Sequence, residues 1–348
     1  MTSVRDREAL AWFGGHLATG LVEVRRDASG LHEGGWWAVM ADFEGGLVAA
    51  RFARVRPAVL PPAAQPWAGL GGRWQTSLER PAYESAVREV RRRIGAGEVY
   101  QVNICRVLEQ HLSERADLLA LAHATAEHNP APYAGFVRVP GAEVVCASPE
   151  LFLRRDGAQV TTGPIKGTAP SAETMLPKDV AENVMIVDLA RNDLSRVCEP
   201  GSVAVPDLLS VEQHPGLVHL VSRVTGTLLP GTSWATLLSA LLPPASVTGA
   251  PKSTALQAIA DLEPVPRGPY CGAVGWVDAD AGTAQLAVAI RSFWTARDAL
   301  GRRLLRFGTG AGITWGSEPA GEWAETELKA RRLVAIASAP AASAKVDP

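Results

Sequence analysis

Lys166 lies in the segment Thr161–Thr168 (TTGPIKGT), a turn-like stretch that holds an amine where chemistry can use it. Pro164 restricts the backbone, and Gly167 lets the chain come close to a small ligand. A lysine amine held away from water loses pKa and can act as a nucleophile or a base near neutral pH. An exposed loop lysine is the alternative for this turn taken alone. The residues downstream favour a reactive site.

Two pairs of carboxylates recur at helical spacing. Asp179 and Glu182 are three residues apart, as are Glu322 and Glu325, and Lys329 follows one turn later. This spacing places each pair on one helix face. Carboxylates without a histidine or thiol cluster suit a hard cation such as Mg²⁺. The alternative for either helix alone is a solvated acidic face.

Two polar turns could bind an anion. Phe307–Ile313 (FGTGAGI) is rich in glycine, and its amides could cradle a carboxylate. Ser246–Lys252 (SVTGAPK) leads into a helix expected to start near Ser253, and a helix N-terminus favours an anion. Neither turn has the spacing of a Rossmann or Walker nucleotide loop.

His219 and Arg291 lie in apolar, strand-like runs. A lone histidine there is usually a hydrogen-bonded core residue. A buried arginine at the end of the strand Gly272–Phe293 requires a carboxylate, from the protein or from a ligand. Residue chemistry therefore predicts a small substrate with at least one carboxylate.

The composition limits the class of protein. The chain has 348 residues, 47% of them apolar and 20% charged, with a net charge of −2, so it can bury a large core. No basic stripe predicts nucleic-acid binding, and no apolar run predicts a membrane span. The four cysteines are far apart, and residues 1–8 carry no apolar signal, so we expect a cytoplasmic protein.

The elements that must position these residues are mixed. Residues 1–75 form a short β-rich segment, 76–340 a catalytic core and 341–348 a loose tail, and the pattern predicts an α+β fold. Helices are expected at 83–94, 118–127, 180–194 and 322–336, and strands at 99–108, 142–146, 217–229 and 272–293.

The chain resembles the chorismate-utilising enzymes over roughly residues 80–338. The matching segments, in the family's order, are Gly97–Asn103, Ser148–Glu150, Pro164–Thr168, Glu182–Leu189 with Arg191–Leu194, His219–Ser222, Thr248–Lys252, and Gly310–Ile313 with Glu322–Thr326. The resemblance implies the fold of anthranilate synthase large subunits, with two large antiparallel sheets packed as a sandwich and helices outside.

Two positions distinguish members of the family. Gln101 matches the ammonia-using members, where water-using members have a lysine base. Lys166 matches aminodeoxychorismate synthase component I, where anthranilate synthases usually have alanine. The resemblance therefore implies amination of chorismate at C4 to 4-amino-4-deoxychorismate, for para-aminobenzoate, folate or related biosynthesis.

The resemblance also implies a role for each site residue. Lys166 attacks C2, Glu150 protonates the leaving C4 oxygen, and His219 orients the ring. Mg²⁺ binds Glu182 and Glu325, supported by Asp179 and Glu322. The expected substrate-binding residues are Arg291, Tyr270, Gly310, Ala311, Gly312, Lys329, Gly167, Thr168, Ser246, Gly249 and Gln101. Ammonia comes from a separate glutamine amidotransferase subunit.

Three alternatives stay open. Anthranilate synthase component I also uses Mg²⁺ and ammonia, and Lys166 argues against it. A non-catalytic chorismate-binding homologue would not need Lys166, Glu150, Glu182 and Glu325 together. A pyridoxal enzyme would use a Schiff-base lysine, but no partner pattern for the pyridinium accompanies Lys166.

Overall fold

The fold is described from a computed structural model, which covers residues 8–169, 171, 173, 177–214 and 217–340. The tail expected at 341–348 lies outside the described residues. The α-helices of the described part are α1 (Arg80–Gly95), α2 (Leu118–His128), α3 (Pro177–Ser195), α4 (Trp234–Leu241), α5 (Lys252–Leu262) and α6 (Pro319–Ser338). Among these residues, no helix combines the length and the apolar composition that crossing a membrane requires.

The strands form one continuous antiparallel ladder in two halves. The first half runs in spatial order through β13 (Leu217–Thr227), β10 (Gln159–Gly163), β9 (Leu151–Asp156), β16 (Thr283–Val288), β15 (Ala273–Asp278), β3 (Trp36–Ala41), β4 (Leu47–Pro57) and β2 (His16–Arg25), and β13 also pairs with β11 (Ile165–Ala169) and β12 (Ala204–His214). The second half runs through β1 (Leu10–Phe13), β7 (Tyr133–Val139), β8 (Ala142–Ser148), β17 (Ser292–Arg297), β18 (Arg303–Ile313) and β6 (Gln101–His111), which also pairs with β5 (Gln75–Thr76) and β14 (Gly249–Ala250).

Strand β1 joins the two halves, because it pairs with β2 on one edge and with β7 on the other. The α+β class with antiparallel strands and outer helices is therefore confirmed, and the two expected sheets are linked by hydrogen bonds. The N-terminal strands also continue into the rest of the ladder, because β3 pairs with β15.

The main core lies between the two halves of the ladder. Apolar side chains from both halves meet there, with Val39, Leu153 and Leu286 from the first and Ile104 and Ile313 from the second fully buried. Alternation along each strand places one face inward, so burial of this face holds the halves together.

A second core packs the outside of β17 and β18 against helices α2 and α6. Phe293, Phe307, Leu121, Leu333 and Ile336 are all fully buried there. The side chain of Asp117 accepts a hydrogen bond from Leu119 N and so begins α2 as its N-cap. Burial of one face of α6 fixes the direction in which its other residues point.

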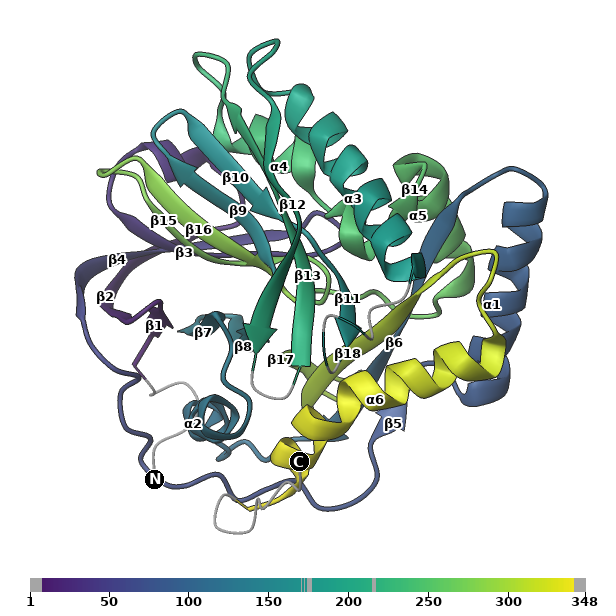
Figure 1. Ribbon diagram of the computed structural model, residues 1–348. Helices are drawn as coiled ribbons and strands as arrows, with labels where there is room; N and C mark the ends of the chain where they lie inside the picture. The colour runs from purple at the N-terminus through teal and green to yellow at the C-terminus, as the bar shows by residue number, and fades with distance from the viewer. Residues whose placement is uncertain (1–7, 170, 172, 174–176, 215–216, 341–348) are drawn as a thin grey trace.

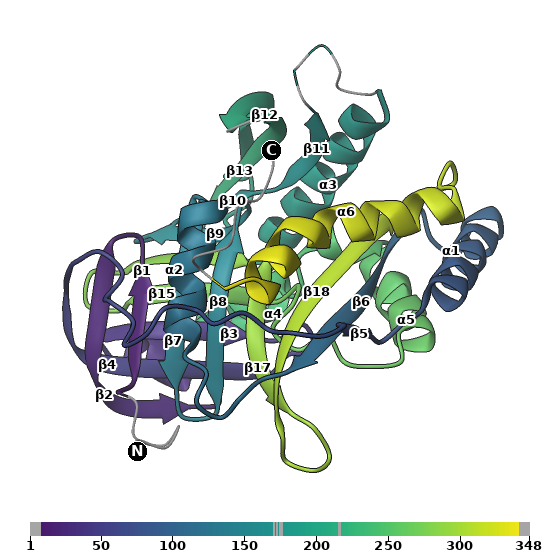
Figure 2. The ribbon, with the colours of Figure 1, turned by 90° about the horizontal axis from the view of Figure 1, so that it is seen from below.

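Helices α3 and α6 lie over the two ends of the ladder. Helix α3 packs on β11 and β13, while α6 packs on β18 and against α1. Figure 1 shows α1, α3, α5 and α6 on one side of the molecule, with α3 above α6, and Figure 2 shows the same helices from below. Glu182 of α3 and Glu325 of α6 both act on the pKa of Lys166, so the two expected carboxylate helices face the space around one amine.

The continuous strand expected at 272–293 is wrong. The chain forms β15, turns, forms β16 and then leaves the sheet before β17. Arg291 has a φ of 54°, in the left-handed region that interrupts a strand. The expected helices are confirmed, and α4 lies in a segment for which the sequence predicted no element.

Candidate active site

The turns expected around Lys166 and at Phe307–Ile313 are wrong, because long-range pairing makes these segments part of strands β11 and β18. Lys166 lies on β11, at an irregularity in the pairing with β13. The register shifts between Ile165 and Thr168, so Lys166 and Gly167 occupy a bulge. A bulge turns a side chain out of the regular alternation of the strand. The Lys166 amine reaches across to α3, where its Nζ lies 3.9 Å from Glu182 Oε2.

Charged groups from several elements surround the Lys166 amine. Burial lowers the pKa of Lys166, while Glu182 raises it, Lys329 lowers it, and Glu150 and Glu325 raise it. Burial is the largest effect, so the neutral amine is favoured relative to a lysine in water. The structure thus brings together the lysine and the three carboxylates that the sequence predicted for the reaction.

Glu150 lies in the connection between β8 and β9 and is only 4% exposed. Its backbone is held at both ends, since its N–H donates to Ser148 Oγ at 3.1 Å and its carbonyl accepts from Val288 N at 3.0 Å. Burial raises the pKa of Glu150 to about 7, against the lowering effects of Ser246, Lys166 and the Ile165 amide. A carboxyl with this pKa can give a proton at neutral pH.

The carboxylates of α3 and α6 lie near lysines, and Glu182 and Glu325 both raise the pKa of Lys166. Glu325 Oε1 lies 2.6 Å from Lys329 Nζ, one turn along α6, and Glu182 lies near Lys166. Their oxygens are hard donors that come from two rigid helices and fit Mg²⁺ better than a soft metal. Within the described residues no three His, Cys, Asp or Glu side chains gather as a complete metal cluster. The Asp179 side chain lies outside the described part, and Glu322 is half-buried in the first turn of α6.

Three expected substrate-binding residues are linked in one chain of contacts. Lys329 Nζ donates to the Gly310 carbonyl at 3.1 Å, and Arg291 Nη1 donates to the Lys329 carbonyl at 2.8 Å. Burial lowers the pKa of Arg291, and Tyr270 raises it. The left-handed backbone of Arg291 thus turns its guanidinium toward α6 and β18.

Tyr270 lies behind this surface rather than on it. Its side chain is 5% exposed within the main core, and a Cβ at Gly308 would overlap its ring. Burial raises the pKa of Tyr270 well above its usual range, with Cys105 and Cys271 as neighbours. Tyr270 therefore supports β18 from inside.

The start of β6 carries buried amides without hydrogen-bond partners. Both polar atoms of the Gln101 side chain and Asn103 Nδ2 are unpaired within the described part of the chain. A Cβ at Gly312 would overlap Gln101 Nε2, so glycine lets the Gln101 amide reach β18. Gly249 has a φ of 147°, and a Cβ at this position would overlap the Gln101 carbonyl. Glycine here therefore allows β14 to pair closely with β6.

The remaining expected residues lie on neighbouring strands. His219 pairs with Thr168 across β13 and β11, and Ala311 pairs with Ile104 across β18 and β6. The side chains of His219 and Thr168, and the surroundings of Gly167, lie outside the described part.

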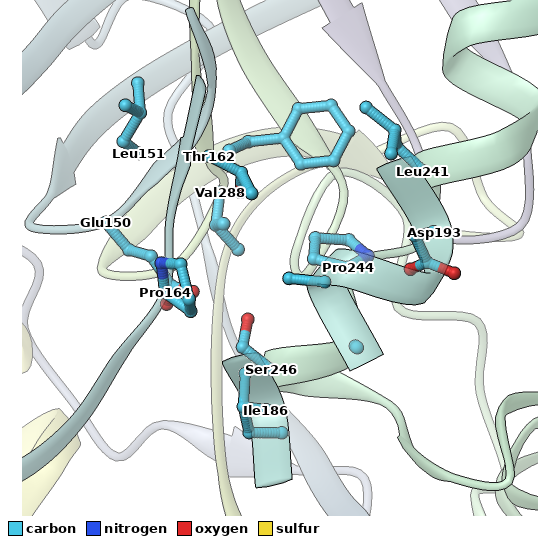
Figure 3. A pocket seen from close by; sticks show the side chains of 13 residues that line it. Glu150, Leu151, Thr162, Pro164, Ile186, Asp193, Leu241, Pro244, Ser246 and Val288 are labelled. Carbon is cyan, nitrogen blue, oxygen red and sulfur yellow. The ribbon is translucent and has the colours of Figure 1, made fainter. Parts of the chain in front are cut away.

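A partly buried ion pair beside the site had no sequence signal. Lys252 Nζ lies 2.5 Å from Asp193 Oδ2, and the two residues are 59 positions apart. Both lie in segments that the sequence matched to the family, but no role followed from their types or spacing. Asp193 also lines a cavity of about 30 Å³ together with Glu150 and Ser246 (Figure 3).

Comparisons with known proteins agree with the geometry. A sequence profile described as chorismate binding enzyme matches residues 47–335. Anthranilate synthase component 1 from Aeropyrum pernix is 38% identical over 74% of this chain and 60% of its own length. Aminodeoxychorismate synthase component 1 from Klebsiella aerogenes is 36% identical over 75% of this chain and 60% of its own length. The chain thus spans about three fifths of the length of these relatives.

Several further relatives, from archaea and bacteria, also carry the name anthranilate synthase component 1. Among solved structures, anthranilate synthase component I from Streptococcus pneumoniae superimposes with a TM-score of 0.76 at 22% identity, over 96% of this chain and 91% of that one. This likeness shows the fold.

Proposed function

Because the chain belongs to the chorismate-binding enzyme family, we propose that it aminates chorismate with ammonia. One observation carries the proposal: a largely buried lysine, Lys166, lies beside Glu182 and within electrostatic reach of Glu150. Loss of the C4 hydroxyl needs a proton donor, and Glu150 has the pKa of one.

The amine of Lys166 makes C4 the proposed site of amination. Lys166 attacks C2, the ring double bonds shift, and the C4–O bond breaks while Glu150 gives its proton, so the oxygen leaves as water. Ammonia then attacks C4, the double bonds shift back, the C2–N bond breaks, and Lys166 regains its amine. The ammonium formed at C4 loses one proton to solvent, and the product is 4-amino-4-deoxychorismate.

The carboxylates of Glu182 and Glu325 would hold Mg²⁺, with Asp179 and Glu322 as supporting groups. When bound, the cation supplies positive charge for a carboxylate of the substrate. Lys329, one turn from Glu325, adds a further positive charge on the same helix.

The second carboxylate of chorismate would bind Arg291 and the amides near Gly310 and Gly312. Arg291 is held by the Lys329 carbonyl, which leaves the other donors of its guanidinium for an anion. Small residues on β18 allow the ligand to lie against the strand.

A second candidate is anthranilate synthase component I, which aminates C2 and releases pyruvate. The names of most of the similar curated proteins favour it. The side chain of Lys166 favours the C4 reaction, because direct attack of ammonia at C2 needs no protein nucleophile.

The experiment is an assay of the chain with chorismate, Mg²⁺ and an ammonium salt, with product identification by mass and absorbance. We expect 4-amino-4-deoxychorismate with the enolpyruvyl group retained. Anthranilate and pyruvate would instead establish the second candidate. Glutamine should replace ammonium only when a glutamine amidotransferase subunit is added.

A further inference from the structure

The cavity beside Glu150 connects the active site to an ion pair on its far side. Its volume of about 30 Å³ is enough for a water molecule. Glu150 and Ser246 line one side, and Asp193 of α3 lies across from them near Leu241 and Pro244 (Figure 3).

Ser246 presents an unpaired hydroxyl to this cavity. Ser246 is 6% exposed, and its Oγ has no hydrogen-bond partner within the described part of the chain. The hydroxyl lies close enough to lower the pKa of Glu150, without the geometry of a complete hydrogen bond. Most of the lining is apolar, but Glu150, Thr162, Asp193 and Ser246 supply polar groups. A buried hydroxyl beside a cavity of this size with several polar partners is normally satisfied by water.

The ion pair of Asp193 and Lys252 lies between the cavity and the solvent. The side chain of Asp193 is 10% exposed, whereas that of its partner Lys252 is 20% exposed. Burial raises the pKa of Asp193, while Lys252 and Arg196 lower it. A carboxylate between a cavity and a partly exposed amine can exchange protons with both.

Glu150 needs a route by which it can recover a proton. This argument rests on the proposed function. It is 4% exposed, and its other charged neighbour is Lys166, on the side that substrate would cover. It gives one proton to the leaving oxygen, and it must recover one before the next turnover.

We propose that this cavity holds water that passes protons between Glu150 and the Asp193–Lys252 pair, with the Ser246 hydroxyl as a carrier. Ser246 gives its proton to the Glu150 carboxylate and takes one from the water, and the water takes one from the Asp193–Lys252 pair, which recovers it from solvent. Each group ends with the protons it began with.

The test fills the cavity without touching an ionisable group. Ala190→Val places extra methyl groups on the α3 wall of the cavity, and Ala82→Val on the exposed face of α1 is the matched control. We expect Ala190→Val to lower kcat about tenfold or more, a part of the ~10²–10⁴-fold that general acid–base catalysis supplies. KM for chorismate should stay within about twofold, since the contacts with substrate are unchanged. The solvent isotope effect in D₂O should increase, and Ala82→Val should match the wild type.

Ser246→Ala and Ser246→Thr provide a second test. Removal of the hydroxyl should lower kcat, and threonine, which keeps it, should restore most of the rate. Crystals of the wild type should show water between Glu150 and Asp193, and crystals of Ala190→Val should not. A rise in KM with kcat unchanged in Ser246→Ala, or a normal rate and isotope effect in folded Ala190→Val, would overturn the relay while wild-type amination stands. A wild type that does not aminate chorismate would overturn the proposed function and the relay together.

Discussion

Lys166 Nζ lies 3.9 Å from Glu182 Oε2, across the gap between strand β11 and helix α3. The pair joins the residue proposed as nucleophile to a residue proposed as metal ligand. The carboxylate favours the charged amine and burial favours the neutral one, with burial the larger effect on the pKa of Lys166. The amine is therefore available while a carboxylate still orients it.

Lys166→Ala should abolish formation of 4-amino-4-deoxychorismate. The covalent route then closes, and a rate loss of about a thousandfold corresponds to roughly 4 kcal/mol of barrier. Ammonia can still attack C2 directly, so we expect a trace of C2 amination. The measurement is product identity by mass and absorbance.

An adduct gives an independent readout of the same step. Wild-type enzyme given chorismate without ammonia should gain the mass of chorismate less one water, on Lys166. Near-normal formation of the 4-amino product by Lys166→Ala, without an adduct in the wild type, would contradict the covalent route and favour anthranilate synthase.

Turnover should fall as pH rises through about 7, because the pKa of Glu150 is raised to about 7 and only its protonated form can donate. In Glu150→Gln this limb of the pH–rate profile should disappear along with most of the activity. A profile of Glu150→Gln that keeps the limb would assign it to another group.

The free energy of unfolding should also depend on the protonation of Glu150. An unfolded glutamate loses its proton near pH 4.5, whereas folded Glu150 keeps it to about pH 7, so the free energy of unfolding falls as pH rises between these values, by at most about 3 kcal/mol. Glu150→Gln should remove this part of the pH dependence. Denaturant melts at pH 4.5 and pH 7.5 measure it.

Glu182→Ala and Glu325→Ala should each lower Mg²⁺-dependent turnover at least about 100-fold, since a bound cation supplies several kcal/mol. Calorimetry should show weaker Mg²⁺ binding in both variants. Glu318→Ala removes an acidic side chain that is 78% exposed at the start of α6, and it is the control. Full wild-type activity in the presence of a chelator would defeat the metal assignment.

Arg267 should be a large contributor to stability near the site. Its guanidinium donates to Glu263 at 2.6 and 2.8 Å, to the Val247 carbonyl at 2.9 Å and to the Asn103 carbonyl at 2.9 Å. Arg267→Met leaves Glu263 buried without its partner and should cost about 3–5 kcal/mol of unfolding free energy. The double variant with Glu263→Met should cost less, as urea melts would measure. If the double variant lost as much unfolding free energy as Arg267→Met, or the sum of the two single losses, this account would be contradicted.

The sequence by itself determined the local features of the site. The i, i+3 carboxylates on α3 and α6 and the helix after Pro251 depend on neighbours within one or two turns. The resemblance to the family added the antiparallel fold. These predictions succeeded because short-range spacing and backbone preference act within one element.

Only the tertiary structure decided how these elements meet. The pairing of β3 with β15 and of β6 with β18 joins segments that are distant in the sequence. The pairing of β9 with β10 and the packing of α3 on β11 bring Glu150, Lys166 and Glu182 into one neighbourhood. The raised pKa of Glu150, the left-handed turn at Arg291 and the Asp193–Lys252 pair all follow from burial and long-range contact. Neither burial nor a partner 59 positions away is encoded in local spacing, because both arise only when distant segments exclude water between them.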